Sequence, residues 1–442
     1  MAAMVLGESE DAIPPGGVDK DLAEHRNSES QLLQLPTELL HHILSGLSSV
    51  ELARVSSACR ALAEHASNDL LWANLLNANL PCKIHDPGPF ASFRNLYTAY
   101  YPCWFIPRQK LWFADSEHTG NLILARYDNR RGVIEAYRVV AERRSHQFQT
   151  WQWNPDVIVL SFNPKVSLWL DDPVLFLKNT PSAEGPPRQP RYLNGEIRMP
   201  MAYDYQTVSN SLSLCSNRLP SHREMHPDRQ WPPPNIPSDN WVYRDADTHW
   251  SEWDEPPKHQ DEISESAFRI RRWAHFRMGM PVFTAGSSET MTTFATLDPS
   301  LYTPSKDKPY QGIWVGDYSA HGCEFLLFIQ RGHSDGITTT STTSPVEGTN
   351  QPGDNNNNSG NETVPQGSLE AVKLTGDPNV PRGEISFISE DIGQGGFVRI
   401  ADDALFPNSR IVRSKGHVAG LGFRDGEYNI PLPMMNRNKS NL

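Results

Sequence analysis

Four side chains that can do chemistry lie within eight residues in the C-terminal half of the chain. The stretch YQGIWVGDYSAHGCEFLLFIQRG holds Asp317, His321, Cys323 and Glu324 between Asp317 and Glu324. A cysteine beside a histidine can serve as a nucleophile when the histidine takes its proton. The same polar groups, set between glycines, can instead line a loop that binds a ligand.

The residues around this group predict two strands, Ile313–Val315 and Cys323–Ile329, joined by the loop Gly316–Gly322. Both faces of the second strand are apolar, so we expect it to be buried on both sides in a sandwich or barrel. Glu324 then starts a buried face and needs a partner for its charge. Cys323 is expected to face the core, where a thiol is inert.

Three interpretations of this stretch remain open: a nucleophilic site, a structural hairpin, and a loop that contacts a ligand. The sequence has no G-x-S-x-G, no phosphate loop, no H-E-x-x-H and no G-x-G-x-x-G motif. It also lacks C-x-x-C, so no zinc site is predicted. We therefore expect no enzyme, no cofactor and no metal, and favour the ligand-contacting loop.

The composition narrows the class of protein. The 442 residues suit two or three domains, and 36 prolines predict long irregular segments. A formal net charge of −12 does not favour nucleic acid or an anionic membrane as partners. The five cysteines are odd in number and scattered, and no apolar run approaches a membrane helix or signal peptide. We expect a reducing compartment, the cytoplasm and/or the nucleus.

Helical periodicity begins after residues 1–30, which are polar and expected to be disordered. Residues 31–80 predict a three-helix bundle. Ser48 and Glu51 form an S-x-x-E capping box at the start of the second helix, and Asn68 can cap the third helix.

One apolar stripe predicts that the second helix is continuous. It runs at helical spacing through Leu52, Val55, Cys59 and Leu62. A further helix is expected over Ser92–Tyr100. A bundle this small buries little surface alone and gains from packing on a partner.

The bundle resembles an F-box, on the stretch LLQLPTELLHHILSGLSSVELARVSSACRALAEHASNDLLWANLL. The resemblance implies docking to a Skp-type adaptor and, through it, to a cullin–RING ubiquitin ligase. Such docking lays an apolar helical face into a groove of the partner. The adaptor-binding residues that it implies are Leu35, Pro36, Leu39, Leu40, Ile43, Leu47, Leu52, Val55, Cys59, Arg60 and Trp72.

The remainder predicts antiparallel sheet, since KLWFAD, GNLILARYD and GVIEAYRVV are short and rich in aliphatic and aromatic residues. The fold class is therefore α+β: an N-terminal three-helix F-box bundle followed by a mostly antiparallel, β-barrel-like substrate-binding domain. Proline is excluded from interior strands, so residues 180–262 are interpreted as a Pro-rich insertion. Its tryptophans can still attach it to the body: Trp231, Trp241, Trp250 and Trp253.

The expected domain organisation follows these changes in pattern. It consists of a disordered N-terminus (1–30), the F-box (31–80), a helical linker (81–101), the first part of the β domain with its insertion (102–330), a low-complexity disordered loop (331–368), the last strands (369–428) and a tail (429–442).

Two stretches, GIWVGDYSAHGCEFLL and AVKLTGDPNVPRG, resemble the C-terminal cyclin-D-binding domain of the F-box only protein thirty-one family, here in a fungal-like version with insertions. A related domain occurs without an F-box in the plant EXECUTER proteins. The resemblance implies a pocket that holds a protein substrate, cyclin-like or a C-terminal tail. The substrate-binding residues it implies are Tyr318, His321, Gly322, Glu324, Lys373 and Asp377.

The two resemblances together lead to one hypothesis and one alternative. The hypothesis is a non-catalytic substrate-recognition subunit of an SCF-type ubiquitin ligase. The alternative is an adaptor-bound F-box scaffold with a peptide-binding β domain and no degradative role. Where the family has a further aliphatic strand, the chain continues IPLPMMNRNKSNL, so we expect a β domain one or two strands short with an exposed edge.

Overall fold

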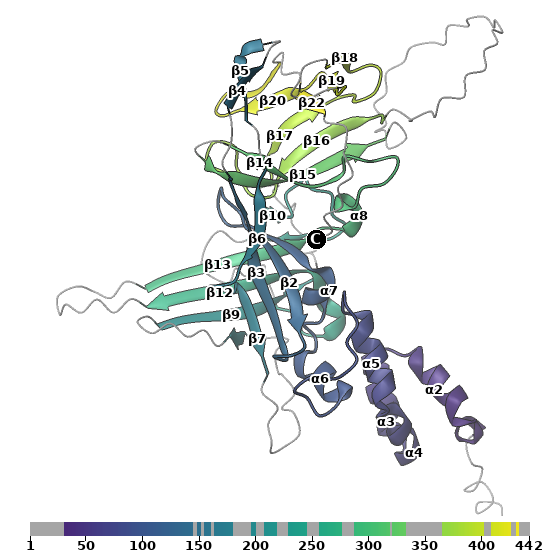
Figure 1. Ribbon diagram of the computed structural model, residues 1–442. Helices are drawn as coiled ribbons and strands as arrows, with labels where there is room; N and C mark the ends of the chain where they lie inside the picture. Colours follow the sequence, from purple (N-terminus) through teal and green to yellow (C-terminus); the bar gives the residue numbers. More distant parts are fainter. Residues whose placement is uncertain are drawn as a thin grey trace, which may run out of the picture. The chain divides into compact units, whose positions relative to one another are not determined.

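The fold is described from a computed structural model of the 442-residue chain (Figure 1). The structure describes residues 31–144, 148–151, 154–160, 163–179, 196–199, 207–218, 229–244, 256–275, 287–318, 321–332, 365–401, 408–425 and 430–432. The chain divides into two compact units, one of Met1–Ala78 with Ser92–Arg94 and one of Asn79–Ala91 with Asn95–Leu442. The expected disordered N-terminus, and most of the low-complexity loop, lie outside the described residues.

The first unit is helical, as predicted. The capping box is confirmed: the Ser48 backbone N–H donates to Glu51 Oε2 at 2.8 Å, and the Glu51 N–H donates to Ser48 Oγ at 3.3 Å. The Leu70 N–H donates to Asn68 Oδ1 at 2.9 Å, which confirms the third cap. Its elements are η1 (Gln31–Gln34), α2 (Thr37–Ser45), α3 (Ser49–Ala58), α4 (Arg60–Ala66) and α5 (Asp69–Ala78).

The predicted second helix is interrupted at Cys59, where the prediction of a continuous helix was wrong. Cys59 has extended backbone angles (φ −158°, ψ 165°) and separates α3 from α4. Its sulfur accepts a hydrogen bond from the Leu62 N–H at 3.5 Å, so it caps α4. Cys59 therefore points out of the stripe and is exposed.

The second unit is mostly antiparallel sheet, and its large sheet curls into a half-barrel. Its strand order is β6-β3-β2-β1-β13-β12-β9-β8, and β7 also pairs with β3. Figure 1 shows the long strands β9, β12 and β13 running side by side. The strands are β1 (Leu111–Ala114), β2 (Leu122–Asp128), β3 (Val133–Glu142), β6 (Lys165–Trp169), β7 (Leu175–Lys178), β8 (Ile197–Met199), β9 (Thr207–Ser216), β12 (Ile263–His275) and β13 (Ser287–Thr296).

A second antiparallel sheet carries the stretch that holds Asp317, Cys323 and Glu324. Its order is β14-β15-β16-β17-β20-β21, and Figure 1 shows β14 to β17 as neighbours. A three-stranded sheet, β18-β19-β22, completes the C-terminal strands. The bounds are β14 (Gly312–Asp317), β15 (Cys323–Arg331), β16 (Ser368–Lys373), β17 (Ile385–Ser389), β18 (Phe397–Ile400), β19 (Arg410–Val412), β20 (Lys415–Val418), β21 (Gly422–Asp425) and β22 (Ile430–Leu432).

Short elements fill the connections of the second unit. The helices α6 (Phe93–Tyr100) and α7 (Phe105–Gln109) precede β1, the 3-10 helix η4 (Gln260–Glu262) precedes β12, and α8 (Pro299–Tyr302) precedes β14. Two short antiparallel pairs also occur: β4 (Phe148–Trp151) with β5 (Asn154–Leu160), and β10 (Gln230–Trp231) with β11 (Val242–Tyr243). The helix expected over Ser92–Tyr100 is confirmed as α6.

The Pro-rich interval contributes two strands to the large sheet, which its interpretation as an insertion did not predict. β8 and β9 both lie inside residues 180–262, and β9 pairs with β12 along most of its length. Trp231 is buried, as expected of a residue that attaches the interval to the body, whereas Trp241 is exposed. Trp250 and Trp253 lie outside the described residues.

One hydrophobic core joins strands from distant parts of the second unit. It brings Phe113 and Leu122 from the first strands, and Trp231 from the Pro-rich interval, against Leu327 of β15 and Val372 of β16. The prediction that β15 is buried on both faces is confirmed. The two motifs with the cyclin-binding resemblance therefore fold as part of a larger body.

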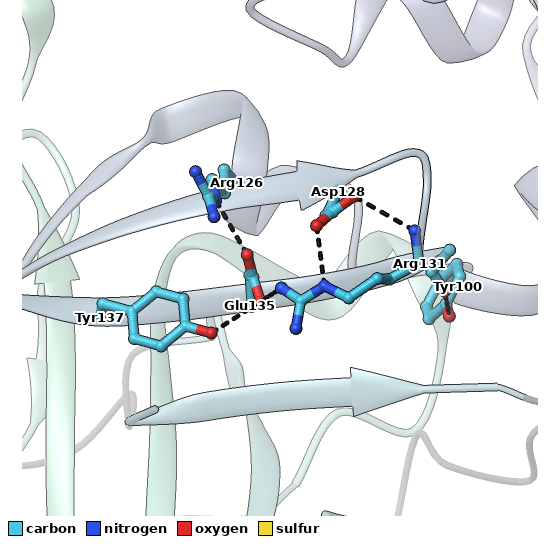
Figure 2. A network of polar contacts seen from close by, with 7 residues as sticks. Tyr100, Arg126, Asp128, Arg131, Glu135 and Tyr137 are labelled. Carbon is cyan, nitrogen blue, oxygen red and sulfur yellow. Dashed lines mark hydrogen bonds and ion pairs between the residues drawn. The ribbon is translucent and has the colours of Figure 1, made fainter. Parts of the chain in front are cut away.

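A buried charge network lies on β2 and β3 (Figure 2). The fully buried carboxylate of Glu135 accepts from Arg126 Nε at 2.8 Å, from the Arg131 guanidinium, and from the Tyr137 hydroxyl at 2.9 Å. Arg131 also donates from Nε to Asp128 at 2.8 Å. Each carboxylate thus has a guanidinium partner, which meets the requirement that a buried charge be paired.

Within the part of the chain that the structure describes, the helices are all too short or too polar to cross a bilayer.

Candidate functional site

The predicted adaptor-binding residues divide into core and surface in the first unit. Leu40, Leu52 and Trp72 are buried and hold the helices together. Leu39 and Ile43, four residues apart on α2, are 53% and 48% exposed. Two residues at that spacing share one face of a helix. The other members of the set are exposed at Pro36, Cys59 and Arg60 and half-buried at Leu35, Leu47 and Val55.

The second candidate site is assembled by the pairing of β15 with its neighbours. β14 pairs Gly316 with Glu324, and β16 pairs Leu326 with Lys373. The N–H groups of Leu374 and Thr375 both donate to the Phe325 carbonyl, at 2.8 and 3.2 Å. Two motifs separated by a long stretch of sequence are therefore joined by backbone hydrogen bonds. The strand β14 runs through Gly316 to Asp317, so the connecting turn is shorter than predicted.

The centre of this site is a buried triad of Glu324, Lys373 and Asp377. The Lys373 side chain is completely buried, and its Nζ lies 2.7 Å from Glu324 Oε2 and 2.9 Å from Asp377 Oδ2. This satisfies the expectation that Glu324 needs a partner. Asp377 also forms a turn, because its Oδ1 accepts the Asn379 N–H at 2.6 Å and the Val380 N–H at 3.1 Å.

One ammonium group serves two carboxyl groups, and their pKa values move apart. Burial raises the pKa of Glu324 to about 7, against the opposing effect of Lys373. Asp377 is also buried, but the Lys373 ammonium and the turn N–H groups outweigh this and hold its pKa well below the usual range. Glu324 is therefore the group of the triad that exchanges a proton near neutral pH. When protonated, it can donate to Asp377.

Tyr318 covers the triad from the turn between β14 and β15. Lys373 Nζ lies 4.0 Å from the centre of its ring, a cation–π contact, and its hydroxyl is 2.6 Å from Ser386 Oγ. A Cβ on Gly316 would come within 2.8 Å of the Tyr318 ring, so this close approach requires glycine. Burial raises the pKa of Tyr318 to about 12, so it stays a phenol at physiological pH.

The exposed rim of the site consists of His321, Pro378 and Asn379. The Asn379 amide nitrogen lies 3.0 Å from His321 Nε2, so the two turns meet at this point. Gly322, the remaining predicted residue, has a φ of +91°, which favours glycine in the turn. The predicted substrate-binding residues therefore lie together, but only His321 offers an exposed polar group.

Cys323 does not form a nucleophilic site with His321. It is half-buried rather than fully buried as predicted, and it pairs across the strands with Asp317. Burial and the nearby Asp317 carboxylate raise the pKa of the thiol, which keeps it protonated. Among the described residues, no group of three or more metal-ligating side chains is placed to hold a metal ion.

Residues outside the first motif also anchor the site, and the sequence did not predict them. Arg382 Nε donates to the Ser116 carbonyl at 2.5 Å, and its guanidinium lies 4.6 Å from the Trp231 ring centre. The Gly376 and Arg382 N–H groups donate to the Thr119 and His118 carbonyls, at 2.8 and 2.9 Å. Arg382 lies within the motif AVKLTGDPNVPRG, so its position could have indicated a role in the site. Its partners lie in the β1–β2 turn, where no sequence motif indicated a contact with the site.

Comparison with known proteins gives two family matches. Residues 32–78 match the F-box-like family, and residues 294–432 match the Cyclin D1 binding domain family. Protein EXECUTER 2, chloroplastic, from Arabidopsis thaliana is 25% identical over 164 residues, which cover 36% of this chain and 22% of that protein. The chain thus spans about a fifth of the length of that relative.

Proposed function

We propose that this chain, which combines an F-box-like domain with a Cyclin D1 binding domain, is the non-catalytic substrate-recognition subunit of an SCF-type ubiquitin ligase. The F-box-like domain binds a Skp-type adaptor, and the C-terminal unit binds a target protein, cyclin-like or through a C-terminal tail. The adaptor links the bound target to a cullin–RING ligase.

The observation that carries this proposal is the pair Leu39 and Ile43 on α2. Each leaves about half of its side chain exposed although the interior of the bundle is already filled by Leu40, Leu44 and Trp72. An apolar pair on one helical face supports docking into a groove of another protein. The F-box-like match over residues 32–78 supports a Skp-type adaptor as that protein.

The rim at His321 and Asn379 supports a target-binding role for the second unit. The triad is buried, so its contribution is to hold the two turns in place rather than to touch a target. His321 and Asn379 are exposed and offer hydrogen-bonding groups to a peptide. A target peptide would contact these two turns, and Lys373 and Tyr318 would act as positioning residues that hold the turns in place.

One co-purification experiment tests both halves of the proposal. The full chain is expressed with a Skp-type adaptor and a cyclin-type target, and both are quantified after capture. Leu39→Ala/Ile43→Ala is expected to lower recovery of the adaptor at least tenfold and leave the target. His321→Ala is expected to do the reverse. Leu170→Ala is the matched control, because it removes an equally exposed leucine from the β unit.

Unchanged adaptor recovery with the Leu39→Ala/Ile43→Ala variant would overturn the adaptor site, and unchanged target recovery with His321→Ala would overturn the rim. The alternative, an F-box scaffold without a degradative role, is separated by measuring target abundance with and without proteasome inhibition. If the chain is a ligase subunit, proteasome inhibition is expected to raise the level of the target only when Leu39 and Ile43 are intact.

A further inference from the structure

A small cleft lies in the second unit, away from the triad and its rim. It has a volume of about 100 Å³ and is enclosed by the end of α6, the residues that follow it, and the ends of β7 and β8. Hydrogen bonds fix these parts together. The Asn179 N–H donates to the Tyr100 hydroxyl at 3.0 Å, and the Asn179 amide donates to the Ala99 carbonyl at 2.8 Å. The cleft is therefore a built feature of the fold.

The walls of the cleft are of two kinds. Leu177 and Cys103 are buried and Ile197 is half-buried, which gives an apolar floor. Lys178 and Arg198 are exposed and give a cationic rim. Neither cation has an ion-pair or hydrogen-bond partner among the residues that the structure describes. The nearby acidic residues Glu196 and Glu265 form ion pairs with Arg271 and Arg108, respectively.

Tyr101 supplies the observation that points to a ligand. It lines the cleft, and its hydroxyl is buried without a hydrogen-bond partner within the described part of the chain. A buried hydroxyl without a partner destabilises a protein, and such groups require an explanation. A ligand oxygen in the cleft would provide the partner. Burial also raises the pKa of Tyr101 to about 12, so the hydroxyl is a donor at neutral pH.

The size of the cleft limits what it can hold. Sites for drug-sized molecules and cofactors occupy roughly 300–1,000 Å³, so this cleft is too small for them. Its volume equals that of about three water molecules at roughly 30 Å³ each. A group of a few non-hydrogen atoms fits. An apolar floor beneath two cations suits a short hydrocarbon stem that ends in an anion.

We propose that this cleft binds a carboxylate on a short aliphatic stem. The carboxylate lies between Arg198 and Lys178 and accepts the Tyr101 hydroxyl, and the stem occupies the floor. Arginine and lysine both bind carboxylates, and arginine can do so with two hydrogen bonds. The chemistry is shared by a free short-chain acid and by a glutamate side chain of a bound protein. The chain carries a net charge of −12, so a saturable affinity for an anion would be a property of this site rather than of the whole surface.

The test uses ligand-observed NMR titration of the full chain with butyrate, and with butyramide as its neutral analogue. We expect saturable butyrate binding in the millimolar range and at least tenfold weaker binding of butyramide. Lys178→Gln/Arg198→Gln is expected to weaken butyrate binding at least tenfold. Lys83→Gln, which removes an exposed lysine away from the cleft, is the matched control and should bind as the unaltered chain does.

Tyr101→Phe gives a second, independent measurement. It removes the hydroxyl that lacks a partner, so thermal stability without ligand should stay equal or rise, while butyrate binding falls several-fold. Titration with N-acetyl-glutamate amide identifies the source: tighter binding than butyrate indicates a protein side chain, and weaker binding a free acid. Equal binding of butyrate and butyramide, unchanged binding by the Lys178→Gln/Arg198→Gln variant, or no saturation up to about 20 mM would overturn the proposal.

Discussion

Glu135 and Glu324, two of the buried carboxylates of the second unit, are paired with cations in different ways. Glu135 lies between two arginines and a tyrosine hydroxyl, with Asp128 balancing the second arginine. Glu324 shares a single lysine with Asp377. The first network balances its charges without a proton, whereas the second is balanced only when Glu324 is protonated. The charges of the Glu135 network therefore balance without a change in protonation, whereas the charge of the Glu324 triad changes with pH.

The largest effect is expected from Lys373→Ala. The substitution leaves two buried carboxyl groups facing each other without a cation, and losing one partner of a buried ion pair costs about 3–5 kcal/mol. Urea unfolding at pH 7.5 measures this loss. Lys415→Ala is the control, since its pair with Glu390 is exposed and contributes little. Equal losses for the two variants would show that the triad is no more than a surface contact.

Glu135→Gln should give the next largest loss, about 2–3 kcal/mol, because it removes a charged acceptor from two arginines and a hydroxyl. The same unfolding experiment at pH 6 and pH 8 should give the same loss, since arginine remains charged throughout. Glu117→Gln, at a largely exposed glutamate, is the control. If the loss of stability in Glu135→Gln changed strongly between pH 6 and pH 8, the Glu135 network would depend on pH as the triad does, and the proposed difference between them would be wrong.

Glu324→Gln should have the smallest effect and the opposite sign. Its pKa is raised in the folded state to about 7 from 4.5, so between these values the folded chain keeps a proton that the unfolded chain releases. Stability therefore falls as pH rises through this window. The glutamine variant stays neutral and should be more stable than the unaltered chain by about 1–2 kcal/mol at pH 8.

That advantage should disappear well below pH 4.5, where Glu324 is protonated in both the folded and the unfolded state. The comparison is made by urea unfolding of both proteins at several pH values. A glutamine variant that is less stable at pH 8 would show that Glu324 is held as a carboxylate.

Local chemistry made the helical unit predictable from sequence. The Ser48–Glu51 box and the Asn68 cap act within three residues, and the structure forms both. The break at Cys59 was not predictable from apolar spacing, because a cysteine fits the stripe equally well as a core residue or as a cap. Which role it takes depends on packing between the helices.

Pairing between distant residues made the β unit harder to predict. Each motif of the site was visible, and so was the need of Glu324 for a partner. Its pairing with Lys373 depends on the register of β15 with β16 across a long intervening segment, which no local pattern sets. Likewise, β9 reads TVSNSLSLCS, whose apolar residues alternate, but the surrounding prolines outweighed this signal.

The hydrogen bonds that join Arg382 and Gly376 to the β1–β2 turn have a practical consequence for grafting. The segment 294–432, moved alone into another protein, would lose the carbonyl acceptors of residues 115–119 and the aromatic ring beneath Arg382. It would also expose Leu327 and Val372, whose neighbours come from earlier strands. The segment that matches the family is therefore shorter than the unit that folds, and a graft that keeps these contacts must begin before Leu111.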